Sequence, residues 1–218
     1  AWGTALATLL CKNGHDTVLW CRSADRAVEI EATGKNPRLK DVLLPKALRV
    51  SADPACVRGC RMVVIASPSS HIRTVSRAVA PYIAADAVMV SVTKGIEEGS
   101  LLRMSQIVAQ ETGHKVVALS GPCHAEEVAR QVPTGCLAAC DDRGLAEFVQ
   151  DAFMSESFRV YTSPDAVGAE LGGALKNVIA LCAGVVTGLG YGDNTKAMLM
   201  TRGLTEIARL GVSMGARR

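Results

Sequence analysis

The sequence is constrained most by a regular alternation of two hydrophobic patterns along most of its length. Short apolar runs, typical of buried parallel strands, are separated by stretches with apolar residues at helical spacing. The strand-like runs cover residues 16–21, 61–66, 87–92, 115–119, 135–139 and 158–161. The helical stretches cover residues 2–12, 24–33, 70–80, 101–111, 125–131 and 145–153. This alternation predicts an α/β fold with a doubly wound, mostly parallel sheet of Rossmann type.

The pattern changes after Ser163-Pro164, where a domain boundary is expected. No strand-like run follows, only long helical stretches punctuated by glycines. We therefore expect an α/β domain over residues 1–164 and the start of an all-α domain over residues 165–218. Residues 35–45 are polar and carry prolines, which favours a loop.

Composition excludes several classes of protein. Hydrophobic residues make up 49% and charged residues 21%, so the chain can bury a core. A scattered net charge of +3 and 4% aromatic residues argue against a nucleic-acid partner. No run reaches the roughly 20 apolar residues of a membrane span, so none is expected. The eight cysteines lie in apolar segments without zinc spacing, which predicts reduced, buried thiols, no metal and a cytoplasmic setting.

The first helix begins almost at residue 1, whereas a doubly wound nucleotide fold normally opens with a strand and a glycine-rich turn. Gly3 stands where the third glycine of G-x-G-x-x-G would lie. The expectation is a chain whose first strand, with the other two glycines, precedes Ala1. The alternative is an ordinary glycine at a helix N-terminus.

Several segments together resemble one family. They are AWGTALA at residues 1–7, LWCR at 19–22, TKGIE at 93–97, SGP at 120–122, FRVYTSPDAVGAELGGALKN at 158–177, GLGYGDNTKA at 188–197 and TRGLTEIARLG at 201–211. In this order they resemble the NAD(P)-dependent glycerol-3-phosphate dehydrogenases. The resemblance implies a Rossmann-type NAD(P)-binding domain followed by the first part of a helical substrate domain. It also implies hydride transfer between NAD or NADP and the C2 carbon shared by dihydroxyacetone phosphate and sn-glycerol 3-phosphate.

The resemblance makes Lys176 the acid/base lysine and Lys94 a contact to both substrate and cofactor. Lys176 lies one helical turn after Gly172-Gly173, whose missing side chains allow a close approach, and its apolar flanks predict a helix buried on most sides. Burial or a second cation is needed to lower the pKa of a catalytic lysine, and Lys94 is the expected second cation. A solvated surface lysine is the alternative at each position.

Residues 120–122 join a strand to a helix, where free backbone N–H groups can hold an oxyanion. The resemblance assigns Gly121 and Cys123 to substrate binding and Ala125 to cofactor binding. Cys123 departs from the family's usual Ser or Thr, replacing a hydroxyl with a weaker donor. His124 replaces the usual Phe and is expected to pack rather than to catalyse.

Further candidates surround the expected cofactor. Arg22 stands where an NAD-preferring fold carries an acidic residue, so its guanidinium would accept the 2′-phosphate of NADP; a solvated arginine is the alternative. The resemblance places Trp2 and Pro68 beside the cofactor, although Trp2 suits the core equally. Asn177 either orients substrate hydroxyls or caps local backbone.

Two other functions remain open at the level of sequence. One is a β-hydroxyacid- or ketopantoate-type dehydrogenase, which also joins a Rossmann domain to a helical domain. The other is a non-catalytic nucleotide-binding module. The favoured hypothesis is glycerol 3-phosphate formation for phospholipid synthesis. This chain alone is expected to be inactive, and a homodimer is the candidate assembly of the enzyme to which it belongs.

Overall fold

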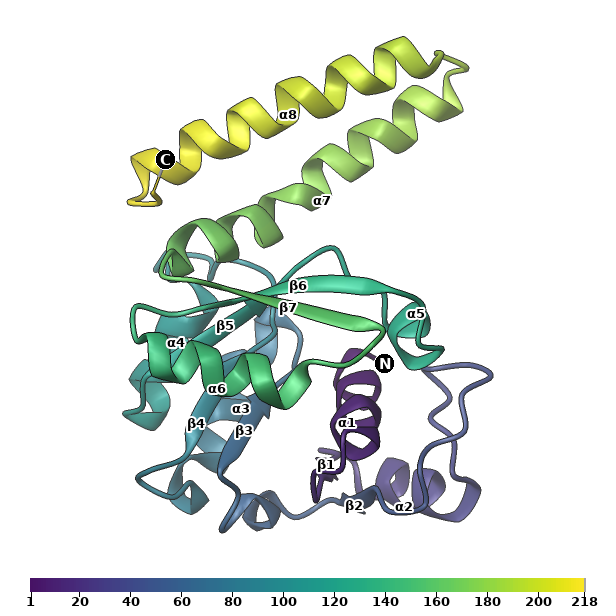
Figure 1. Ribbon diagram of the computed structural model, residues 1–218, viewed down its shortest axis with the longest axis vertical. Coiled ribbons are helices and arrows are strands. Elements are labelled where there is room, and N and C mark those ends of the chain that lie inside the picture. The colour runs from purple at the N-terminus through teal and green to yellow at the C-terminus, as the bar shows by residue number, and fades with distance from the viewer. Residues whose placement is uncertain (218) are drawn as a thin grey trace.

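The computed structural model describes residues 1–217 (Figure 1). Strands alternate with helices as far as Ser163, and two long helices follow. The strands are β1 (Val18–Trp20), β2 (Arg49–Ser51), β3 (Met62–Ile65), β4 (Val88–Ser91), β5 (Val116–Ser120), β6 (Thr134–Ala139) and β7 (Phe158–Ser163). The α-helices are α1 (Trp2–Lys12), α2 (Ala24–Thr33), α3 (Ile72–Val79), α4 (Met104–Thr112), α5 (Ala125–Ala129), α6 (Arg143–Phe153), α7 (Ala166–Gly188) and α8 (Asp193–Ser213). Short 3-10 helices cover Pro54–Val57, Ser69–His71 and Ala80–Tyr82.

Five strands form the main sheet in the order β3-β4-β5-β6-β7. All neighbouring pairs are parallel except β5 and β6, so the predicted mostly parallel sheet is confirmed. β1 and β2 form a separate parallel pair. β2 was not predicted, because its three residues, RVS, are too short to give a hydrophobic pattern. The strand expected before Ala1 lies outside the described residues.

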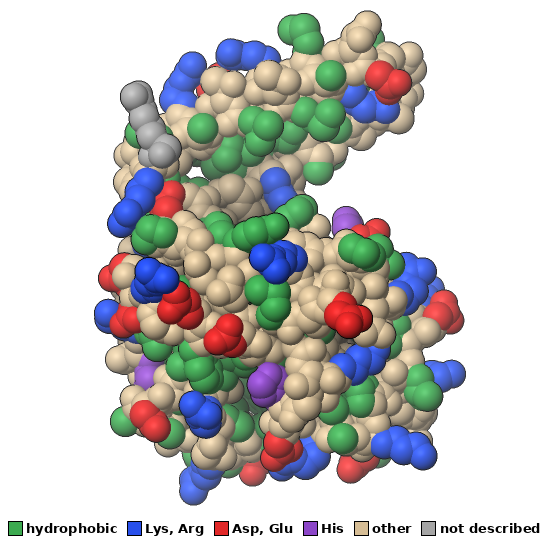
Figure 2. Space-filling view, in the orientation of Figure 1, with side chains coloured by type: hydrophobic (Ala, Val, Ile, Leu, Met, Phe, Trp, Pro, Cys, Tyr) green, Lys and Arg blue, Asp and Glu red, His purple; other side chains and the backbone are tan. Residues whose placement is uncertain are grey.

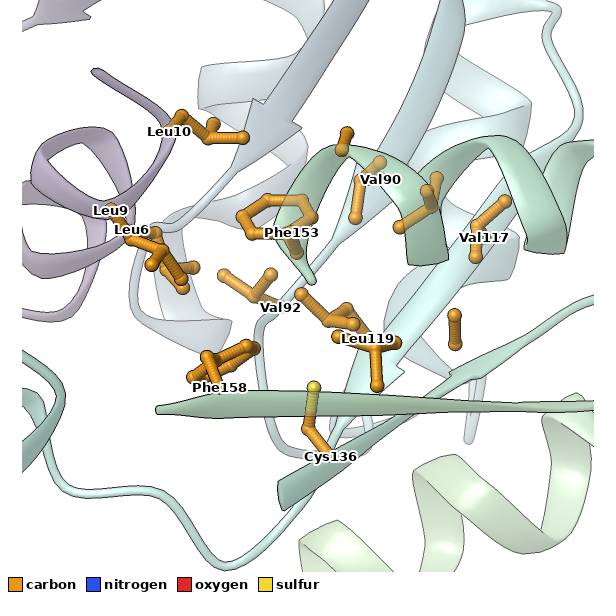
Figure 3. Packing of buried hydrophobic residues seen from close by; sticks show 14 of the residues in the cluster. Leu6, Leu9, Leu10, Val90, Val92, Val117, Leu119, Cys136, Phe153 and Phe158 are labelled. Atoms are coloured by element: carbon orange, nitrogen blue, oxygen red, sulfur yellow. The ribbon is translucent and has the colours of Figure 1, made fainter. Parts of the chain in front are cut away.

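Helices cover both faces of the main sheet. On one face, α1 and α6 pack against alternate strand side chains, and Phe153 of α6 contacts the cluster that contains Val90 and Leu119 (Figure 3). On the other face, α3 and α4 pack around Met89. Adjacent residues of β4 therefore belong to opposite faces, as a strand requires, and the whole strand is buried.

The helices α7 and α8 form a hairpin that projects from the α/β part (Figure 1). Gly203 of α8 is needed for their contact, because a Cβ there would lie 2.6 Å from Cδ1 of Ile179. Beyond Gly173 the residues of α7 are half-buried or exposed, and Val178 is 58% exposed. The prediction that α7 is buried on most sides is wrong, since only its first turns contact the sheet. Figure 2 shows hydrophobic side chains along the hairpin.

One expectation drawn from composition needs correction, and a second, the absence of a membrane span, stays a prediction. All eight cysteines lie within residues 1–217 and are free, but only Cys136 and Cys140 are buried; the others are partly exposed, because apolar neighbours in sequence do not ensure burial. By length and composition alone, α7 is apolar enough to cross a membrane, with 11% of its most apolar window buried. Lys176 is the one charged residue in residues 171–188, and a single helix of this kind is weak evidence for a membrane span.

Candidate active site

The candidate site lies where the carboxyl ends of β3, β4 and β5 meet the beginning of α7. Lys94 follows β4, the Gly121 turn follows β5, and Pro68 follows β3. Parallel α/β sheets bind ligands at this edge, because the connections there leave a crevice. Lys176 reaches the same region from α7.

The loop that carries Lys94 is held in place on both sides. The hydroxyl of Thr93 donates to the carbonyl oxygen of Ser67 at 2.8 Å, which ties this loop to the one after β3. Gly95 has a φ of 146°, and a Cβ there would lie 2.9 Å from the Cβ of Ser69. Glycine is therefore required beside Lys94 for both conformation and space.

Lys94 is half-buried, and its Nζ donates to the carbonyl oxygen of Gly121 at 2.7 Å. Burial lowers the pKa of Lys94, and the positive charge of Lys176 lowers it further. The second effect requires the two ammonium groups to be near each other. The role of Lys94 as the second cation for Lys176 stays a prediction, with which this electrostatic effect agrees.

Gly173 brings α7 close enough for this effect. A Cβ at Gly173 would lie 2.6 Å from Oγ of Ser120 and 3.7 Å from Cγ of Lys94. Lys176 follows one helical turn later on the same flank of α7. Lys176 is partly exposed and forms no hydrogen bond or ion pair within the described chain, so its amine is available to a ligand.

The turn after β5 packs tightly on β6. A Cβ at Gly121 would lie 2.9 Å from Cα and Cβ of Cys136, which makes glycine necessary. The thiol of Cys123 donates to the carbonyl oxygen of Gly135 at 3.6 Å. Burial raises the pKa of Cys123, while Lys94 and Lys176 act in the opposite direction. Cys123 therefore lies near both lysines as a neutral thiol.

The cofactor candidates lie around the beginning of α1. A Cβ at Gly3 would stand 3.0 Å from that of Ala66, so glycine lets α1 start beside the end of β3. Trp2 is partly buried between two clusters of the core. Arg22 is exposed just after β1 and forms no ion pair within residues 1–217. Ala125, the first residue of α5, packs beside α1.

This donor set suits a dinucleotide. The first N–H groups of α1 have no partner within the helix and carry its positive dipole end, which favours phosphate. Gly3 leaves room at that end, and Arg22 offers a guanidinium for a further anionic group.

Two predicted residues lie differently from the others. Asn177 points about 100° away from Lys176 around the helix, and its side chain is exposed and forms no hydrogen bond within the described residues. His124 is exposed at the start of α5, so the prediction that it packs is wrong. The five-residue α5 leaves its preceding residue on the surface.

Sequence reasoning missed two buried polar residues near the site. Asn36 donates to Oγ1 of Thr4 at 2.7 Å, which holds the loop after α2 against α1. Glu170, in the first turns of α7, is only 7% exposed. A charged residue inside the apolar sequence around Glu170 was the available signal; Asn36, in a polar loop, gave none.

A mostly parallel sheet, a helix whose N-terminus lies beside the end of β3, and two lysines at the carboxyl edge define a Rossmann-type dinucleotide-binding protein joined to a helical part. The chain belongs to the NAD-dependent glycerol-3-phosphate dehydrogenase family. The description of the family's N-terminus matches residues 1–146, and that of its C-terminus matches residues 165–218.

Individual relatives agree with this assignment. A protein of Pelotomaculum thermopropionicum named glycerol-3-phosphate dehydrogenase (NAD(P)+) is 52% identical over 99% of this chain and 64% of its own length. One of the same name from Moorella thermoacetica is 48% identical over the whole chain and 65% of its own length. The crystal structure of glycerol-3-phosphate dehydrogenase from Coxiella burnetii superimposes with a TM-score of 0.92 at 35% identity, over 99% of this chain and 67% of its own.

The chain thus spans about two thirds of the length of these relatives. Their names support the dehydrogenase that the sequence resembles. They do not favour a β-hydroxyacid- or ketopantoate-type enzyme.

Proposed function

We propose that this chain forms the cofactor site and one side of the substrate site of an NAD(P)-dependent glycerol-3-phosphate dehydrogenase. The whole protein would interconvert dihydroxyacetone phosphate and sn-glycerol 3-phosphate. We assign residues 1–164 to cofactor binding and residues 165–218 to the beginning of the substrate domain. Family membership and the two lysines at the sheet edge support this proposal.

The cofactor would lie across the beginning of α1. The N–H groups beside Trp2 and Gly3 would hold its pyrophosphate, and Arg22 would accept the 2′-phosphate of NADP. Pro68 and Ala125 would line the cleft on either side. The nicotinamide supplies or accepts the hydride when it is bound.

Lys176 would exchange the proton of the C2 oxygen of the substrate. Its partner Lys94, half-buried and hydrogen-bonded to the carbonyl oxygen of Gly121, has a lowered pKa because burial and the second cation both disfavour its charge. Of the two lysines, Lys94 releases its proton more easily than an isolated lysine, because burial and the charge of Lys176 disfavour its ammonium form. The two lysines also attract the substrate phosphate, while Gly121, Cys123 and Asn177 would complete this side of the site.

The approach of Lys176 to Lys94 is the observation that carries the proposal. Replacing Lys176 by Met in the longer protein is expected to lower kcat by orders of magnitude, because no proton donor remains at the C2 oxygen. Turnover is measured by nicotinamide absorbance, and cofactor binding by fluorescence. Binding is expected to persist.

Lys196→Met is the matched control, since Lys196 on α8 pairs with Asp193 at the far end of the hairpin, away from the sheet edge. Its turnover should remain close to that of the unmodified protein. Near-normal turnover of Lys176→Met would remove Lys176 from the mechanism.

We further propose a cytoplasmic enzyme whose product serves phospholipid synthesis. Eight free cysteines suit a reducing compartment. A homodimer would cover part of the apolar surface of the α7–α8 hairpin, and light scattering of the longer protein would test that assembly.

A further inference from the structure

Glu170 is the one acidic side chain that is buried within residues 1–217. It lies on α7, two turns before Lys176, and its side chain is 5% exposed. A buried carboxylate is costly unless each oxygen is hydrogen-bonded. Its partners therefore indicate why this residue is placed inside the protein.

All partners of Glu170 come from the beginning of α4. The backbone N–H of Ser105 donates to one carboxylate oxygen at 2.8 Å. The hydroxyl of Ser105 donates to the other oxygen at 2.6 Å, and the guanidinium of Arg103 pairs with the same oxygen. The carboxylate also meets the positive end of the α4 dipole. The first turn of α4 thus binds α7 through a fully satisfied anion.

This contact lies on the side of α7 that packs on the α/β part of the chain. Glu170, Gly173 and Lys176 are spaced three residues apart, and each is rotated about 60° from the one before, so Gly173 points between the directions of Glu170 and Lys176. Glu170 is fixed to α4, which packs on the sheet, and Gly173 is in contact with Ser120. Two fixed points on one helix determine its rotation and its position along its axis.

We propose that Glu170 is a positioning residue whose hydrogen bonds to Ser105 and Arg103 hold α7 so that Lys176 lies beside Lys94. The proposal rests on the proposed function only for the role of Lys176 in proton transfer. The placement of the two lysines is a property of the fold and is measurable without turnover.

The experiment measures the reactivity of Lys94 in the longer protein to which this chain belongs. Lys94 is acetylated with trace anhydride across a pH series, and the midpoint is determined by peptide mass spectrometry. The unmodified chain should give a midpoint below the ordinary 10.5, because burial and Lys176 both act on Lys94. In Glu170→Ala the midpoint should rise towards 10.5. Glu170→Gln, which retains an acceptor for Ser105, should give an intermediate value.

Three further variants distinguish positioning from a general loss of structure. Leu171→Ala removes a buried neighbour on the same helix but leaves the carboxylate in place, so the midpoint should stay near that of the unmodified chain. Ser105→Ala, a milder change, should give a smaller rise. In a Lys176→Met background, Glu170→Ala should raise the midpoint of Lys94 by less than it does alone, because the charge of Lys176 is already absent.

An unchanged midpoint in Glu170→Ala would overturn the proposal, as would an equal rise in Leu171→Ala or full additivity in the double variant. If Glu170→Ala does not fold, Ser105→Ala decides by the same criterion. The experiment measures amine reactivity and not turnover. The positioning role of Glu170 and the proposed function can therefore be confirmed or overturned independently of each other.

Discussion

At the scale of single residues, the site is governed by three groups with linked electrostatics. Burial lowers the pKa of Lys94 and raises that of Cys123. In both cases burial disfavours the charged form, which is the ammonium of lysine and the thiolate of cysteine. Lys176 acts on both, lowering each pKa. Cys123 is therefore a neutral thiol, and Lys94 is an amine that releases its proton readily.

The thiol of Cys123 should therefore react slowly with iodoacetamide at mildly alkaline pH. Its pKa lies above the ordinary 9.0, so little thiolate is present. Lys94→Met should slow alkylation further, because it removes a cation that stabilises the thiolate. Mass spectrometry of the peptide that contains Cys123 gives the rate. Lys196→Met should leave the rate unchanged, and faster alkylation in Lys94→Met would contradict this account.

At the scale of elements, the site depends on how closely α7 approaches the end of β5. The approach is possible only because Gly173 has no side chain, since a Cβ would lie 2.6 Å from Oγ of Ser120. A Cβ at the neighbouring Gly172 would face open space, because no atom of the described chain lies within 4 Å of its position. The two adjacent glycines thus have different roles.

Gly173→Ala should destabilise the protein by about 1–3 kcal/mol, because the methyl group forces α7 away from Ser120. Gly172→Ala is the matched control and should stabilise α7 by about 0.5–1 kcal/mol, since alanine is the better helix former. Urea denaturation followed by circular dichroism measures both.

Adding Ser120→Ala to Gly173→Ala should restore part of the lost stability, because the remaining neighbours, Cγ of Lys94 and Cβ of Ser120, lie 3.7 and 3.9 Å away. Equal effects of the two glycine substitutions would contradict the assigned contact.

At the scale of the whole molecule, a network of charges ties the loop of Lys94 to both helices on one face of the sheet. Arg73 of α3 pairs with Glu97 at 2.7 Å and with Glu111 of α4 at 2.6 Å. Arg77 also pairs with Glu111, at 2.8 Å. Glu97 follows Lys94 by three residues, so these ion pairs fix the loop of Lys94 to α3 and α4.

Hydrogen bonds from Arg73 and Ser100 lower the pKa of Glu97 to about 2. A carboxyl group whose pKa is depressed by folding stabilises the protein above its unfolded pKa of 4.5 and loses that contribution as pH falls towards 2. The urea midpoint should therefore fall across this interval, and less steeply in Glu97→Gln. Glu156→Gln, at an exposed position, should resemble the unmodified protein. Identical pH dependence in Glu97→Gln and the unmodified protein would contradict the assignment.

Much of this architecture follows from local patterns. The apolar run of β4 and the flanking helical stretches predict a buried strand in an α/β sheet, because burial on both faces selects such residues. The position of Lys94 after that strand predicts that it lies at the ligand-binding edge. By contrast, β2 is too short for any pattern, and its pairing with β1 depends on the fold.

The sequence by itself determined the alternation of strands and helices, the edge at which Lys94 lies and the family, because each is encoded in neighbouring residues. Only the tertiary structure decided that α7 is exposed beyond Gly173, that Asn177 lies on the surface and that Glu170 is buried against α4. The side of a helix that is covered depends on what packs against it. Residues distant in sequence supply that contact, so the hydrophobic spacing along α7 cannot predict which side of the helix is covered.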